Sequence, residues 1–187
     1  MEKKYGIIYA DPPWKYDMKV GTGIAETHYQ VMSVTDICSL SVDGITDRDC
    51  VLFLWATFPQ LKEAFYVIEA WGFKYKTVAW VWIKLNKKTP SPFFGLGYWS
   101  RSNAEICLLA TKGKPKRVSA KVHQLIISPV EGHSKKPDEA RERITQLLGD
   151  IPRIELFARE KTAGWDVWGN EVESDINLPI RKEGTNE

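Results

Sequence analysis

Short apolar runs alternate along the chain with segments that have the periodicity of a helix. Tyr5–Ala10 and Cys50–Ala56 are apolar at almost every position, which is typical of strands in a sheet covered on both faces. Five further strands are expected, at residues 73–84, 104–111, 122–128, 153–158 and 165–168.

Three segments carry the signals of helices. Ser33-Val34-Thr35-Asp36 is a capping-box pattern that opens a short helix. A second helix is expected after Thr57, its N-cap, and is ended by Gly72. A third is expected to be capped by Ser134, with Pro137 in its first turn, and to end at Gly149.

Strands that alternate with helices predict an α/β fold, a mixed sheet with helices on both faces. The length of 187 residues, 43% of them hydrophobic, suits one domain with a substantial core. We expect this domain to occupy residues 1–172 and the polar tail, residues 173–187, to be frayed.

Long loops are expected at residues 15–32, 85–103 and 112–121, and loops of this length in a small domain tend to be functional. The net charge of +2 does not by itself point to nucleic acid. The third loop, however, has several basic side chains and no acidic one, and a local basic patch can hold phosphates. The alternative interpretation is an ordinary solvated loop.

Several classes of protein are disfavoured by what the sequence lacks. It has no uninterrupted apolar run long enough for a membrane span and no secretory signal pattern at its start. The three cysteines are far apart and do not form a zinc pattern. We therefore expect a cytoplasmic protein with reduced thiols, no metal and no membrane contact.

The strand Tyr5–Ala10 ends in Asp11-Pro12-Pro13-Trp14, a stiff turn at the edge where α/β sheets bind ligands. Such a turn suits methylation of the exocyclic amine of adenine, whose lone pair is delocalised into the ring. The Asp11 carboxylate and the Pro12 carbonyl would accept its two hydrogens, and Trp14 would stack on the base. The alternative interpretation is a turn that merely ends the strand.

Further motifs follow in a consistent order over residues 5–171. They are Tyr29 with Met32-Ser33, Tyr98-Trp99, Glu105–Leu108, residues 133–139, Ile154–Arg159 and Gly164–Glu171. Together with Asp11-Pro12-Pro13-Trp14 they resemble the MT-A70 family of adenine methyltransferases, which act on DNA or RNA. The resemblance implies a permuted Rossmann-like methyltransferase fold, with the catalytic motif first and the cofactor segment last.

The resemblance also implies S-adenosylmethionine as cofactor. Lys136, near a helix start, suits the cofactor carboxylate, although it could be a solvated lysine. Glu155 would line the site, although strand alternation could equally turn it to solvent. The other cofactor residues that the resemblance implies are Asp11, Arg159, Lys161, Asn170 and Glu171, with the last three on the ribose and adenosine side.

The target adenine must leave its stack to reach Trp14, and residues 15–32 and 85–121 are expected beside the catalytic strand to hold the nucleic acid. The candidate contacts to bases or phosphates are Tyr29, Trp99, Arg101, Lys112, Lys116 and Arg117. For the aromatic residues the alternative is ordinary core packing. We expect DNA as partner more than RNA, and a homodimer or a partner subunit is compatible with the absence of a separate recognition domain.

Other functions remain open on the sequence alone. RNA methylation, a catalytically silent nucleic-acid-binding subunit, and methylation of protein glutamine or cytosine all use similar sequences. A hydrolase is disfavoured, because His28, His123 and His133 are scattered and no Ser-His or Cys-His arrangement is evident.

Overall fold

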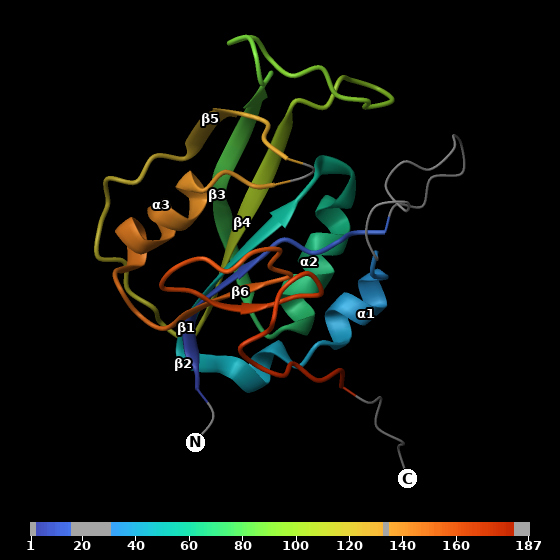
Figure 1. Ribbon diagram of the computed structural model, residues 1–187. Helices are drawn as coiled ribbons and strands as arrows, with labels where there is room; N and C mark the ends of the chain where they lie inside the picture. Colours follow the sequence, from blue (N-terminus) through green and yellow to red (C-terminus); the bar gives the residue numbers. More distant parts are fainter. Residues whose placement is uncertain (1–2, 16–30, 133–134, 182–187) are drawn as a thin grey trace.

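The computed structural model describes residues 3–15, 31–132 and 135–181. At its centre lies a mixed sheet in the strand order β5-β3-β4-β2-β1-β6-β7 (Figure 1). The strands are β1 Tyr5–Ala10, β2 Thr46–Ala56, β3 Lys74–Leu85, β4 Ala104–Lys112, β5 Leu125–Pro129, β6 Arg153–Leu156 and β7 Asp166–Trp168. All seven predicted strands are confirmed.

The direction of each strand decides which loops share an edge of the sheet. β1 runs parallel to β2 and β6, and β7 is parallel to β6. β4 is antiparallel to β2 and β3, and β5 is parallel to β3. Six strands therefore end, and β4 begins, along the same side of the sheet, at the strand ends. We call this side the Asp11 edge because Asp11 directly follows β1.

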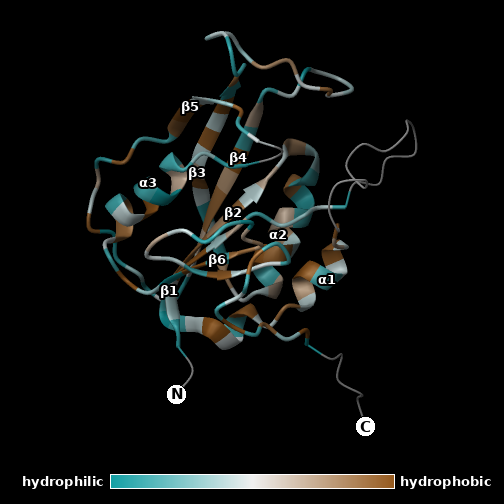
Figure 2. Cartoon of the chain, in the orientation of Figure 1, coloured by the Kyte–Doolittle hydropathy of each residue, from teal (hydrophilic) through white to brown (hydrophobic). Residues whose placement is uncertain are grey.

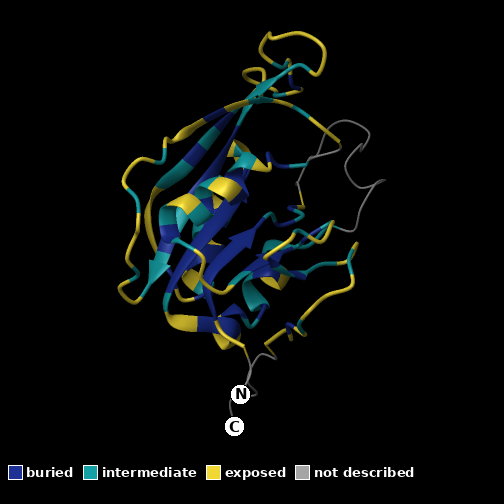
Figure 3. Cartoon of the chain, turned by 60° about the vertical axis from the view of Figure 1, so that its left-hand side comes forward, coloured by how far each residue is buried: buried dark blue, intermediate teal, exposed yellow. Residues whose placement is uncertain are grey.

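Helices cover both faces of the sheet, as predicted (Figure 1). α1, Val34–Ser39, and α2, Leu61–Ala70, pack with Leu52 and Leu54 on one face, and α3, Glu139–Leu148, packs with Phe53 on the other. The apolar strands lie between these layers and are almost entirely buried (Figures 2 and 3). Within the described part of the chain, no helix is long and apolar enough to cross a membrane.

The helix ends follow the predicted chemistry in part. The Ser33 hydroxyl accepts from the Asp36 amide at 3.1 Å, which confirms Ser33 as the N-cap of α1. A 3-10 turn, Phe58–Gln60, separates Thr57 from α2, and Gly72 ends this helix with φ of 80°.

α3 begins later than predicted. Its N-cap is Asp138, because the first turn of hydrogen bonds starts with Ala140 donating to the Pro137 carbonyl. Ser134, the predicted cap, lies outside the described residues.

Two predictions about the last third of the chain are wrong. β6 stops at Leu156, because Phe157 adopts φ of 63° and breaks the extended conformation before Ala158. The segment expected to fray after residue 172 packs on the α1 and α2 face as far as Arg181. Leu178 is buried there, and Arg181 donates to the Ala70 carbonyl at 3.1 Å.

Candidate active site

The Asp11-Pro12-Pro13-Trp14 turn is held on both sides by main-chain bonds. Inside the turn, the Trp14 amide donates to the Pro12 carbonyl at 2.9 Å. Outside it, the Met32 amide donates to the Pro13 carbonyl at 2.9 Å, and the Lys15 amide donates to the Met32 carbonyl at 3.2 Å. The turn is therefore rigid, and the Pro12 carbonyl keeps one lone pair for a substrate hydrogen.

Trp14 has a different role from the one predicted. Its side chain is only 7% exposed and belongs to the core beneath α1 and α2. Its indole nitrogen donates to the Trp55 carbonyl at 3.2 Å, which ties the turn to the end of β2. A side chain with 7% of its surface exposed offers little area to a base, so this conformation gives no support to the prediction that Trp14 stacks on the target adenine.

The Asp11 carboxylate begins a row of alternating charges along the edge. Lys136 donates to the Asp11 carboxylate at 2.7 Å, and its ammonium nitrogen lies 3.3 Å from the Glu105 carboxylate. Glu105 in turn pairs with Lys84. The Lys136 side chain is 7% exposed and the Asp11 side chain 23%, so Asp11 is the member of the pair that faces the outside.

Burial and neighbouring charge set the ionisation of this row. Burial raises the pKa of Asp11, although the Lys136 and Arg159 cations partly offset it. Burial also acts to raise the pKa of Glu105, but Lys136 and Lys84 outweigh it and hold that pKa below its usual range. Burial acts to lower the pKa of Lys136, yet Asp11 and Glu105 outweigh it and raise that pKa. Lys136 thus keeps its charge, and Asp11 is the carboxyl that takes up a proton most readily.

Neither Glu105 nor Lys84 was predicted from the sequence as a site residue, although Glu105 begins one of the motifs of the family resemblance. Both look like ordinary polar positions in alternating strands, and only the pairing of Trp82 with Glu105 across β3 and β4 brings them beside Lys136. A buried carboxylate within an apolar run, as in Glu105-Ile106-Cys107, was the available signal.

The residues predicted for the cofactor gather at the same edge, with two qualifications. Glu155 does not face solvent, because it is buried and receives two bonds from Arg141, at 2.7 and 2.9 Å. Lys161 is exposed and pairs with Asp175 at 3.1 Å, on the outer side of β7.

The other predicted cofactor residues lie closer to the turn. Arg159 follows β6, lies 3.7 Å from the Glu171 carboxylate and lowers the pKa of Asp11. Asn170 and Glu171 are exposed just after β7, whose last residue is level with the end of β1. The edge therefore offers an acid, two cations and exposed polar side chains, a set that fits a zwitterionic sulfonium nucleoside.

The predicted substrate residues separate into two groups. Trp99 and Arg101 lie in the loop between β3 and β4 at the Asp11 edge, and Trp99 is exposed rather than packed in the core. Lys112, Lys116 and Arg117 do not lie beside the catalytic strand, contrary to expectation. Tyr29 lies outside the described residues.

The antiparallel course of β4 explains this correction. β4 begins at the Asp11 edge and carries the chain to the opposite edge, where Lys112 pairs with Cys50. Lys112 is thus five strand residues, about 17 Å, below the level of Trp55 and of the catalytic turn.

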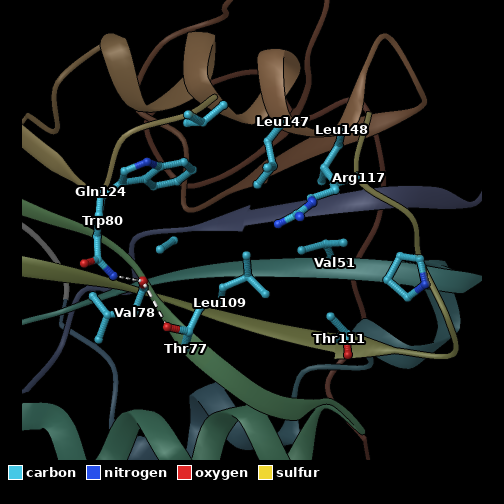
Figure 4. Close-up of a pocket in the computed structure, with 13 residues that line it drawn as sticks. Val51, Thr77, Val78, Trp80, Leu109, Thr111, Arg117, Gln124, Leu147 and Leu148 are labelled. Carbon is cyan, nitrogen blue, oxygen red and sulfur yellow. Dashed lines mark hydrogen bonds between the residues drawn. The ribbon is translucent and has the colours of Figure 1, made fainter. Parts of the chain in front are cut away.

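A cavity of about 390 Å³ lies on the α3 face towards that opposite edge (Figure 4). Val51 and Leu109 form its floor, Leu147 and Leu148 its wall, and Arg117 points into it. None of the predicted catalytic or cofactor residues lines it, so it is separate from the site at the Asp11 edge. Among the described residues, no group of three His, Cys, Asp or Glu side chains could hold a metal ion.

Fold and site together define an α/β methyltransferase domain, with an acidic proline turn at the end of a central strand. The family model described as MT-A70 matches residues 5–171, and the chain belongs to this family. One relative is the type II methyltransferase M.MunI of Mycoplasma sp, 35% identical over 97% of this chain and 84% of its own.

Eukaryotic relatives are also similar, over a smaller share of their length. The N(6)-adenosine-methyltransferase MT-A70-like of Arabidopsis thaliana is 30% identical over 90% of this chain and 24% of its own. The human N(6)-adenosine-methyltransferase catalytic subunit METTL3 is 28% identical over 91% of this chain and 28% of its own. The chain spans about a quarter of the length of these two proteins.

Proposed function

We propose that this protein transfers a methyl group from S-adenosylmethionine to the 6-amino group of adenine in DNA. The observation that carries the proposal is the Asp11 carboxylate, which is partly exposed beside the Pro12 carbonyl on a rigid turn. Two acceptors at one point fit an NH₂ group, and their bonds favour a pyramidal nitrogen whose lone pair is available for attack.

The ion pair with Lys136 keeps Asp11 able to accept. Without a cation, burial would favour the protonated carboxyl, which would donate where an acceptor is needed. The amine becomes strongly acidic only after it has gained the methyl group, so a weak base suffices to take its proton. Asp11 therefore orients the amine first and takes up its proton afterwards.

The cofactor would bind between the catalytic turn and the ends of β6 and β7. The cofactor would supply a methyl group bonded to a positively charged sulfur. This sulfur leaves as a neutral thioether, so the transfer needs no metal from the protein. Lys136 and Arg159 are suited to its carboxylate, and Asp11 to its cationic portion. Asn170 and Glu171 are suited to its ribose hydroxyls, and Lys161 to the ribose edge.

Glu155 would act from behind this site. Its carboxylate is held by both nitrogens of the Arg141 fork, and it lies opposite Tyr9 on β1. In this position it shapes the wall between β1 and α3 that the cofactor contacts.

DNA is the proposed substrate because the similar type II methyltransferase shares 84% of its length with this chain. The relatives named as adenosine methyltransferases share only about a quarter of theirs, and RNA remains the alternative. A homodimer or a partner subunit would add further surface for the recognition of DNA.

Incubation with methyl-labelled cofactor tests the proposal directly. Purified protein is given duplex DNA, single-stranded DNA or RNA, and the nucleosides are then separated and identified. We expect label in N6-methyladenine from DNA. Label in cytosine, or no label with any polynucleotide despite cofactor binding by calorimetry, would overturn it.

A further inference from the structure

A long loop, residues 86–103, rises from the Asp11 edge between β3 and β4 (Figures 1 and 3). Its base is fixed by main-chain bonds. The Lys84 amide donates to the Asn103 carbonyl at 2.8 Å, and the Phe93 amide donates to the Lys84 carbonyl at 2.8 Å. The loop therefore starts from the row of charges that ends at Asp11.

The tip of this loop is shaped by two glycines. A Cβ at Gly95 would lie 1.9 Å from the Ser102 carbonyl oxygen, and one at Gly97 would lie 1.9 Å from that of Ser100. Only glycine lets the two arms approach this closely. The approach leaves Tyr98-Trp99 at the turn, which we call the aromatic tip.

The aromatic tip projects two large rings away from the protein. Tyr98 is 93% exposed and Trp99 94%, and the rings meet edge to face with centroids 5.5 Å apart. Aromatic residues of this size normally bury most of their surface, so a pair held in the open needs a partner.

The charge around the tip indicates what this partner is. No acidic residue occurs between positions 86 and 104, whereas Lys87, Lys88 and Arg101 are basic. Arg101 lies 5.0 Å from the centre of the Phe94 ring, at the side of the tip. Flat rings flanked by cations fit a polyanion with stacked flat bases better than they fit an apolar protein surface.

We propose that Tyr98-Trp99 is a wedge that enters the base stack of duplex DNA beside the target adenine. This inference rests on the proposed function. An adenine paired within a duplex cannot reach Asp11 unless it leaves the stack, and inserted apolar side chains are an established way to open one. The wedge fills the space that the extruded adenine leaves behind, while the loop base positions the duplex over the Asp11 edge.

The test compares paired and unpaired targets. The methylated sequence is first read from genomic DNA treated with the wild-type protein. Two duplex oligonucleotides are then made, with the target adenine opposite thymine or opposite an abasic site. The variants are Trp99→Ala, Trp99→Phe and the control Tyr66→Ala, which removes a half-exposed ring on α2, outside the loop.

We expect Trp99→Ala to lower kcat/KM on the paired duplex about 10- to 100-fold, which corresponds to the loss of ~1.4 to ~2.8 kcal/mol of stacking. On the abasic duplex the same variant should stay within about 3-fold of wild type, because opening costs little there. Trp99→Phe should restore most of the lost rate, and Tyr66→Ala should leave both rates unchanged.

Equal losses on both duplexes, or no loss on either, would overturn the wedge. A loss accompanied by a fall in sedimentation mass would show that the tip joins two copies of the chain, which would also overturn it. Failure of the proposed function is a separate result, since the wild-type protein would then methylate no adenine in the first step.

Discussion

Replacing Lys136 by methionine removes the cation that Asp11 and Glu105 share, and keeps most of the volume of the side chain. The three side chains are 7%, 23% and 11% exposed, so the cost is that of a largely buried ion pair rather than of a surface one. Breaking such a pair costs ~3–5 kcal/mol. This loss is a large share of the ~5–15 kcal/mol by which a typical domain is stable, so it is readily measured.

The loss of unfolding free energy in Lys136→Met should depend on pH in a defined direction. In the variant Asp11 has lost its nearest cation, so burial makes its carboxyl bind a proton more tightly than in the unfolded chain, while Glu105 keeps its ion pair with Lys84. The variant therefore regains stability as the pH falls through the raised folded-state pKa of Asp11. Wild-type Glu105, whose pKa is lowered, loses its stabilising contribution over the acidic range. The difference between the two proteins should be largest near neutral pH and should narrow towards acid.

Urea unfolding of both proteins over a series of pH values measures this difference. Lys135→Met is the matched control, because within the described part of the chain Lys135 pairs only with carboxylates that are more than half exposed, and such pairs are worth ~0–1 kcal/mol. A loss below ~1 kcal/mol for Lys136→Met, or a loss that is constant with pH, would refute the assignment of this cation as the stabiliser of the acidic pair. The same variant should bind the cofactor more weakly in calorimetry.

Four other substitutions test the remaining assignments. Asp11→Ala should abolish methyl transfer while leaving cofactor affinity within a few-fold, and turnover that survives would remove Asp11 from the mechanism. Trp14→Phe should cost ~1–3 kcal/mol in urea unfolding, because the buried Trp55 carbonyl loses its donor; an unchanged midpoint would contradict the anchor role. Arg141→Met should cost ~3–5 kcal/mol because it leaves the buried carboxylate of Glu155 without its partner, and a neutral result would show that Glu155 is neutralised in another way. Arg117→Ala should leave the rate of DNA methylation within about 2-fold of wild type, since this side chain lies towards the opposite edge. A large loss would show that the basic loop, residues 112–121, contacts the DNA after all.

Much of the fold could be predicted because the strands are buried on both faces. A continuous apolar run such as Cys50–Ala56 has few interpretations other than a covered strand, and Gly72 and Gly149 mark helix ends through their backbone conformation. The first and last residues of an element could not be predicted where two local signals compete. Ser134 offers a cap, yet the hydrogen bonds of α3 start only after Pro137.

The composition of the site depended on contacts that lie far apart in sequence. Lys136 is 125 positions from Asp11, and the carboxylate of Glu105 beside an apolar run does not reveal that Lys136 is its partner. The basic loop was misplaced because its chain neighbours at residues 85–103 do lie at the Asp11 edge. Only the direction of β4, which periodicity does not reveal, separates the two loops.

Both ends of the described chain lie at the bottom of the molecule in Figure 1, on the side away from the catalytic turn. Lys3 precedes β1 and contacts Asp166 where β7 begins, and Arg181 is fastened to Asp43 below the start of β2. Polypeptide added at either end would therefore start on the side of the domain opposite Asp11 and would leave the approach to Asp11 open to a nucleic acid. This geometry allows one catalytic core to work within proteins of very different length without any rebuilding of its reactive edge.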